Sequence, residues 1–160
     1  MKKRLLVIAL ATLTSVASAQ SINRATDAQV QAYVHKFVAP DSKPSIQEKV
    51  NSARERASTI IGVQACSNKL SADRLLGRWV APGERPETII NTPIYQLQYH
   101  DKNSCLSVDR IDNFTEPAKN ALSFRVTFVS DSSGESIINT YTLVRQADGA
   151  WLITKAADRW

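Results

Sequence analysis

The chain has 160 residues, with 20 Lys and Arg against 15 Asp and Glu, a net charge of +5 at pH 7, a pI near 9.4 and 43% hydrophobic residues. This length is typical of one domain, and the apolar fraction excludes a wholly disordered chain. Five Gly and six Pro exclude collagen-like and low-complexity chains. The excess of basic residues suggests a nucleic-acid or anionic-membrane partner, provided that these residues cluster in the folded domain.

The N-terminal segment has the pattern of a signal peptide. Lys2, Lys3 and Arg4 form a positive region, Leu5 to Leu13 is apolar, and Ala17-Ser18-Ala19 supplies the small residues before a cleavage site. The apolar run is shorter than the about 20 residues that a membrane-spanning helix needs. An uncleaved membrane anchor is the alternative. No Cys lies directly after the apolar run, at the cleavage site, which disfavours a lipid-anchored form.

Cleavage after Ala19 would leave one domain, residues 20–160, with 17 basic and 15 acidic side chains and a net charge of +2. The excess is uneven, because residues 49–85 carry seven cations and three acids whereas residues 86–160 carry seven cations and nine acids. No run interleaves Lys or Arg with aromatic residues, so we expect no nucleic-acid partner. We expect a periplasmic or secreted protein with no stable membrane insertion after cleavage.

The chain contains two cysteines, Cys66 and Cys105, and no C-x-x-C motif. In an oxidising compartment such a pair predicts one disulfide. The bridge would join positions 39 residues apart and stabilise the fold by about 3–4 kcal/mol in the chain-entropy model. Metal ligation and a reactive thiol are the alternatives. The first lacks partner spacing, and the second lacks a His or a cationic cluster nearby in sequence.

Two amphipathic helices are predicted before residue 67. Thr26-Asp27-Ala28-Gln29 fits a capping box, and Pro40 ends the helix that follows it. A second box at residues 45–48 opens a helix that runs to about Ala65 and places Cys66 at its end. The apolar residues at helical spacing are Val30, Tyr33, Val34, Phe37 and Val38 in the first helix and Val50, Ala53, Ala57, Ile60 and Ile61 in the second.

Residues 67–93 form a long connection in which residues 71–76 fit one helical turn and Trp79 is expected at the core or its rim. After Pro93 the apolar period changes to two, which is typical of strands. The predicted strands are 95–99, 106–111, 122–128, 137–143 and 151–153, with turns at 101–104, 131–134 and 148–149. We therefore predict an α+β fold in which two N-terminal amphipathic helices pack on a curved antiparallel meander of about five strands.

The stretch from Asn120 to Ile153, NALSFRVTFVSDSSGESIINTYTLVRQADGAWLI, places a Phe/Val strand, a polar turn, a Thr/Tyr strand and a Gly-Ala-Trp hairpin in succession. It resembles the last three strands of the nuclear transport factor 2-like, or cystatin-like, superfamily over about a fifth of the chain. The resemblance implies helices followed by long antiparallel strands that curve around them. The superfamily commonly has a third helix before the meander, for which residues 67–93 offer one candidate turn. Because it includes isomerases, dehydratases, secretion-system components and binding modules, the resemblance selects no function.

The sequence contains no nucleophile-elbow, zinc-protease or phosphate-loop motif. Its two histidines, His35 and His100, are expected to face solvent or cap a helix. Asp109 is the candidate general base of an isomerase or hydratase, with Tyr99 or Tyr141 as proton donor, provided that the carboxyl group faces inward. The alternation of the strand instead places Asp109 on the outer polar face. No metal or cofactor is expected.

A group of arginines offers a second kind of site. Such a charged helix face is commonly just solvated, but it would also suit docking of an acidic envelope protein or an anionic envelope polymer. The residues are Arg54, Arg56, Arg74, Arg78 and Arg85. The function predicted from the sequence is an exported, disulfide-stabilised, non-catalytic binding or accessory module of the bacterial envelope. The alternative is a small-molecule enzyme with a carboxylate and tyrosines in a cone-shaped pocket.

Overall fold

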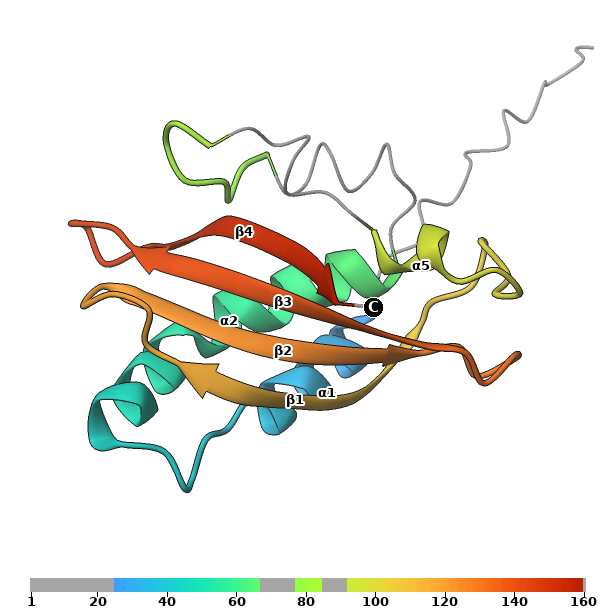
Figure 1. Ribbon diagram of the computed structural model, residues 1–160, viewed down its shortest axis with the longest axis horizontal. Coiled ribbons are helices and arrows are strands. Elements are labelled where there is room, and N and C mark those ends of the chain that lie inside the picture. Colours follow the sequence, from blue (N-terminus) through green and yellow to red (C-terminus); the bar gives the residue numbers. More distant parts are fainter. Residues whose placement is uncertain (1–24, 67–76, 85–91, 160) are drawn as a thin grey trace, which may run out of the picture.

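Helices followed by an antiparallel sheet form the described part of the computed structural model (Figure 1). The structure describes residues 25–66, 77–84 and 92–159, with side chains as far as Thr154. The predicted signal peptide, the helical turn at 71–76, Arg74 and Arg85 lie outside these residues. The elements are α1 (Asp27–Lys36), α2 (Pro44–Cys66), α5 (Pro93–Gln96), β1 (Ser107–Thr115), β2 (Ala121–Val129), β3 (Ser136–Arg145) and β4 (Trp151–Arg159). None of the described helices is long and apolar enough to cross a membrane.

The predicted capping box of α1 is confirmed. The Thr26 hydroxyl accepts a hydrogen bond from the backbone N–H of Gln29 at 3.2 Å, and the Gln29 side-chain oxygen accepts one from the Thr26 N–H at 2.8 Å. Two backbone donors at the helix start are thereby satisfied. The helix ends at Lys36, so Val38 lies beyond it and is exposed.

The capping box predicted for α2 is wrong, because the helix begins two residues earlier than that motif requires. The carbonyl of Lys43 accepts hydrogen bonds from the N–H groups of Ile46 and Gln47, so Pro44 occupies the first helical position. Proline suits this position because its φ is already helical and no N–H is lost there. Ser45 therefore lies inside the helix, and its hydroxyl is free to bind elsewhere.

The core lies between α2 and one face of the sheet. Every apolar residue predicted on the inner face of α2 is buried, and so is each predicted inward residue of β2: Val50, Ala53, Ala57, Ile60 and Ile61, with Leu122, Phe124, Val126 and Phe128. Phe37 closes the core at the end of α1, where its ring meets those of Phe114 and Phe124 edge-on at 5.1 and 4.8 Å. Such edge-to-face contacts add to the stabilisation from burial.

The described strands form one sheet in the order β1-β2-β3-β4, and each is antiparallel to its neighbours. The α+β class is confirmed, with four strands in place of the expected five. In Figure 1, α1 and α2 lie behind the sheet, and no described element covers its front face. Residues 79–81 run beside β4, where the Trp79 carbonyl accepts from the N–H of Ile153 at 2.7 Å. Trp79 is partly buried at the rim of the core, as predicted.

The predicted strand at 95–99 is wrong. Pro93 opens the short helix α5 instead, and the Lys102 ammonium group donates to the carbonyls of Ile94 and Leu97. The N–H groups of Gln98 and Tyr99 both donate to the Glu135 carboxylate. A segment whose backbone groups are engaged in this way has few left for a sheet ladder.

The predicted alternation in β1 is wrong beyond Val108, because the pairing with β2 shifts at that point. Val108 pairs with Phe128 and Arg110 with Thr127, so Asp109 is an extra residue in a β-bulge. The bulge reverses the faces that follow, and Ile111 is buried although it was expected outside. A one-residue shift has this effect because strand side chains alternate with a period of two.

Candidate binding groove

The predicted disulfide between Cys66 and Cys105 is formed, with 4.2 Å between the two Cα atoms. Next to it, the N–H of Leu106 donates to the carbonyl of Ala65 at 2.8 Å. These two connections join the last turn of α2 to the residues that enter β1. The end of the long helix and the edge of the sheet are therefore held at a fixed position relative to each other.

The three residues of the predicted catalytic site are not brought together. Asp109 is exposed on the β-bulge, and Tyr99 lies in a loop with 71% of its side chain exposed. Tyr141 is fully buried, and its hydroxyl donates to the side-chain oxygen of Gln64 at 3.4 Å. The predicted combination of a buried carboxylate with tyrosine donors is absent at these positions.

His100 is buried, which corrects the expectation that it faces solvent or caps a helix. Its Nδ1 atom lies 2.9 Å from the Ser130 hydroxyl, and its Nε2 atom lies 3.1 Å from the Ser104 carbonyl oxygen. A carbonyl only accepts, so Nε2 donates to Ser104, while the Ser130 hydroxyl, which can donate or accept, pairs with Nδ1. The ring links the loop after α5 to the end of β2. His35 is exposed at the end of α1.

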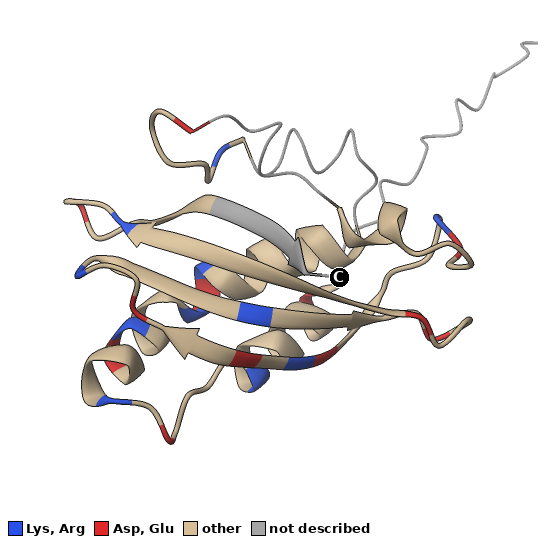
Figure 2. Ribbon diagram, in the orientation of Figure 1, with Lys and Arg blue, Asp and Glu red and all other residues tan. Residues whose placement is uncertain are grey.

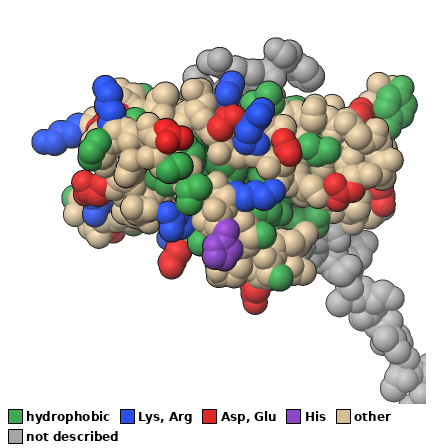
Figure 3. Space-filling view, turned by 90° about the horizontal axis from the view of Figure 1, so that it is seen from below, with side chains coloured by type: hydrophobic (Ala, Val, Ile, Leu, Met, Phe, Trp, Pro, Cys, Tyr) green, Lys and Arg blue, Asp and Glu red, His purple; other side chains and the backbone are tan. Residues whose placement is uncertain are grey.

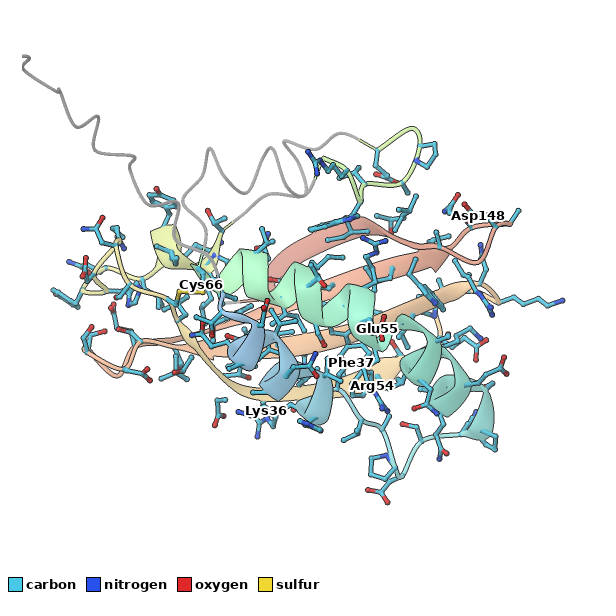
Figure 4. The ribbon with its side chains drawn as sticks, turned by 180° about the vertical axis from the view of Figure 1, so that it is seen from behind. Lys36, Phe37, Arg54, Glu55, Cys66 and Asp148 are labelled. Atoms are coloured by element: carbon cyan, nitrogen blue, oxygen red, sulfur yellow. A yellow bond between two sulfur atoms is a disulfide. The ribbon has the colours of Figure 1, made fainter. Side chains whose placement is uncertain are left out.

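The described members of the predicted docking arginines have different neighbours. Arg54, which lies close to Phe37 in Figure 4, donates to the Phe37 carbonyl at 3.1 Å and to the Asn51 side chain at 2.6 Å. The Arg56 guanidinium lies over the Trp79 ring, 5.2 Å from its centroid. Arg78 is exposed. Figure 3 shows basic and acidic side chains interspersed on the face seen there, so that face carries no continuous basic patch.

A groove runs along α2 where the helix faces the loops that connect β1 to β2 and β3 to β4. It comprises two hollows of about 590 and 370 Å³, which share Trp151 as a lining residue. We call it the α2 groove. Its walls are Ser45, Glu48, Lys49, Ser52, Glu55, Arg56 and Thr59 of α2, and Glu116, Lys119, Asn120, Arg145, Gly149, Ala150 and Trp151 opposite.

Trp151 fixes the middle of the α2 groove. Its side chain is 3% exposed, and its indole N–H donates to the Ser52 hydroxyl at 3.2 Å. The hairpin that delivers Trp151 turns at Gly149, whose φ of +87° is readily adopted only by glycine. Along the opposite wall, the helical residues from Ser45 to Thr59 span about 21 Å at the α-helical rise. This length corresponds to about six residues of extended peptide.

An ion pair closes one end of the α2 groove. The Lys49 ammonium group contacts the Glu116 carboxylate, to which the Ser45 hydroxyl also donates at 3.0 Å. The hydrogen bond from Lys49, followed by that from Ser45, lowers the pKa of Glu116 below its usual range. Glu116 is therefore ionised at neutral pH, and α2 is linked to the loop after β1.

Two cations line the same hollow as this ion pair and have no carboxylate partner within the described part of the chain. Lys119 and Arg145 are exposed, and neither forms an ion pair with any residue that the structure describes. Both line the larger hollow, and the N–H of Arg145 donates to the carbonyl of Asn120, the residue after Lys119, at 2.8 Å. This end of the groove can therefore accept an anionic group.

Neither Lys119 nor Arg145 was predicted from the sequence as part of a site. The polar residues of α2 that line the groove follow the same three- and four-residue spacing as the apolar ones, and this was the available signal. The opposite wall comes from two loops far apart in sequence, so it could not be assigned without the fold.

The described residues contain no group of three or more His, Cys, Asp or Glu side chains that could hold a metal ion. Comparisons with protein-family models, curated proteins and solved structures find no match to this chain. The candidate function consequently depends on the geometry and charge of the α2 groove.

Proposed function

We propose that the protein is a non-catalytic binding module of the bacterial envelope, and that the α2 groove holds a short, extended protein segment carrying an acidic residue. The observation that carries this proposal is the pair Lys119 and Arg145, two cations at one end of a groove about six residues long that form no ion pair with any described residue. A carboxylate bound between them would replace water with charge-assisted hydrogen bonds.

The mixed charge of the α2 groove favours a protein segment over an anionic polymer. Glu48, Glu55 and Glu116 lie among its cations, and they would repel a chain that carries a negative charge on every repeat. Glycan sites commonly use an exposed aromatic face, whereas the Trp151 ring is almost completely covered. A peptide can place its acidic residue at Lys119 and neutral residues elsewhere.

The proposal places the protein in the periplasm or outside the cell. Its support is the N-terminal pattern of a cleaved signal peptide, together with a disulfide, which is typical of oxidising compartments. The relationship to the nuclear transport factor 2-like superfamily also belongs to the proposal, and it rests on the sequence from Asn120 to Ile153.

A peptide-display selection tests the proposal. The probe is a phage library of random dodecapeptides, and the bait is the purified, disulfide-bonded protein. We expect enriched peptides with at least one Asp or Glu, and a loss of affinity of about tenfold for Lys119→Glu or Arg145→Glu, because a like charge then faces the carboxylate.

Arg78→Glu is the matched control, since it makes the same change of net charge at an exposed arginine outside the groove. It should leave the affinity of these peptides within about twofold of the wild type, because long-range charge effects are screened at physiological salt. Peptides that lack acidic residues, or that bind Lys119→Glu as well as the wild type, would refute the proposed site.

A second candidate function is binding of a small polar molecule in the interior. The side-chain nitrogen of Gln64 is buried and has no hydrogen-bond partner among the residues that the structure describes, while its oxygen accepts from Tyr141. A buried donor without an acceptor is costly, and a ligand carbonyl could satisfy it. Ligand-detected NMR with a set of small ketones and amides tests this. Binding that Gln64→Met abolishes supports the interior site, and the absence of binding contradicts it.

A further inference from the structure

The loop after α5 is anchored at several successive residues. The Glu135 carboxylate accepts the N–H groups of Gln98 and Tyr99 at 2.9 and 2.8 Å. The Lys102 ammonium group donates to two carbonyls of the same segment, at Ile94 and Leu97. The loop backbone is therefore fixed by charge-assisted hydrogen bonds, which are stronger than neutral ones.

Two further anchors hold the loop to the rest of the fold. The buried ring of His100 bridges Ser130 and Ser104, and the disulfide of Cys105 follows directly in the chain. The contacts reach the end of β2, the start of β3 and the end of α2. They involve three separate parts of the fold, so the conformation of the loop is set by the tertiary structure.

At the centre of this anchored loop, Tyr99 points outward. Its side chain is 71% exposed, whereas the neighbouring His100 is 4% exposed. A tyrosine on a fixed backbone contributes contact area at a low entropic cost, and aromatic residues of this kind dominate binding energy at protein interfaces. The anchoring contacts thus present one large side chain to a partner.

The charge around Tyr99 is negative. Asp101 is exposed two residues after Tyr99, and the exposed Asp131 follows Ser130, whose hydroxyl contacts the His100 ring. The ammonium group of Lys102 is turned toward backbone carbonyls. Figure 2 shows this end of the molecule, with acidic residues at the turn after β2 and in the loop after α5. An exposed aromatic ring in a negatively charged region is complementary to a cation, which both the carboxylates and the ring attract.

We propose that the Tyr99 loop is a second interaction surface, which binds a protein segment through an arginine or lysine attracted by the Tyr99 ring and by the carboxylates of Asp101 and Asp131. This surface lies at the opposite end of the sheet from Lys119 and Arg145 (Figure 1) and does not depend on the α2 groove. Its partner has the opposite charge preference to the partner of the groove.

The same dodecapeptide library, selected against the wild type and counter-selected on Tyr99→Ala, isolates ligands of this surface. We expect them to carry Arg or Lys, to bind Tyr99→Phe as well as the wild type, and to bind Tyr99→Ala about tenfold more weakly. The double variant Asp101→Asn/Asp131→Asn should also weaken binding, and raising the salt concentration should weaken binding to the wild type. Lys119→Glu should have no effect, which separates this surface from the α2 groove.

Three outcomes would overturn the proposal. The first is that every selected peptide binds Tyr99→Ala as well as the wild type. The second is that the peptides that bind Tyr99→Ala more weakly lack basic residues. The third is self-association of the wild type that Tyr99→Ala abolishes in sedimentation velocity, because the occupant would then be a second copy of this chain. Circular dichroism of the Tyr99 variants serves as the folding control, and an unchanged spectrum is expected for this exposed side chain.

Discussion

The indole N–H of Trp151 donates a hydrogen bond to the Ser52 hydroxyl at 3.2 Å, and this contact joins β4 to α2 across the middle of the α2 groove. The two residues are 99 positions apart in the chain. Tryptophan is buried here with its polar atom satisfied, which is the usual arrangement for a buried indole. The contact determines how closely the β3–β4 hairpin approaches the helix, and with it the width of the groove.

Removal of this hydrogen bond should lower stability. Ser52→Ala leaves the partly buried indole N–H without its acceptor, so we expect the free energy of unfolding to fall by about 1 kcal/mol in urea denaturation. Thr59→Ala is the control, because that hydroxyl donates to the Glu55 carbonyl within the same helix and should change stability by less than about 0.5 kcal/mol. Equal effects of the two variants would contradict a role for the Trp151 contact.

Loss of the disulfide should be costly. The double variant Cys66→Ser/Cys105→Ser is expected to be about 3–4 kcal/mol less stable than the wild type, since the bridge closes a long loop of the unfolded chain. Adding dithiothreitol to the wild type should produce a similar loss and should leave the double variant unchanged. A loss below about 1 kcal/mol would show that the hydrogen bonds around Leu106 suffice to hold this junction.

Acid should weaken the anchoring of the Tyr99 loop. Partial desolvation opposes ionisation of Glu135, but hydrogen bonds from Tyr99, Ser133 and Gln98 outweigh it and lower the pKa below the usual 4.5. The ionised form therefore favours folding, and its contribution is full above the unfolded pKa and lost as the pH falls through the folded one.

The matched variant for this effect is Glu135→Gln. Urea denaturation should show the wild type to be more stable than Glu135→Gln at neutral pH, with the difference disappearing in acid below 4.5. Because the other carboxylates titrate in both proteins, the difference isolates Glu135. A difference that stays constant across this pH range would contradict the charge-assisted anchor.

The exposed and buried members of the predicted catalytic set should behave differently. Asp109→Asn is expected to leave stability within about 0.5 kcal/mol, because the side chain is exposed on the bulge. Tyr141→Phe removes the donor to Gln64 and should cost about 1–3 kcal/mol. Thermal denaturation by circular dichroism measures both effects. A large loss for Asp109→Asn would indicate a structural contact of its carboxylate.

Much of the fold could be predicted from local patterns. The alternation from Leu122 to Phe128 predicted β2 because one face of that strand is buried throughout. The spacing of Val50 to Ile61 predicted α2 for the same reason. The turns at 131–134 and 148–149 each contain a glycine with positive φ, and that requirement is visible in the sequence.

The wrong predictions have long-range causes. Alternation around Tyr95 and Tyr99 resembles a strand, but Glu135 from another part of the chain takes the N–H groups that a strand would use. The bulge at Asp109 is set by pairing with β2, and the burial of His100 is set by Ser130. The polar residues of α2 that line the α2 groove repeat at helical spacing, so this wall could be recognised in the sequence. Lys119 and Arg145 are far apart in the chain, and only the tertiary structure brings them to the same hollow.

The most direct test of the proposed function is a map of backbone and indole amide shifts by ¹⁵N-edited NMR, recorded with an acidic peptide from the library. The predicted result is a set of shifts confined to the walls of the α2 groove, with Lys119, Asn120, Arg145 and the indole N–H of Trp151 among them, and their disappearance in Lys119→Glu. The indole signal is assigned with Trp151→Phe. Shifts that avoid these residues, or that persist in Lys119→Glu, would contradict the assignment of the α2 groove as the binding site.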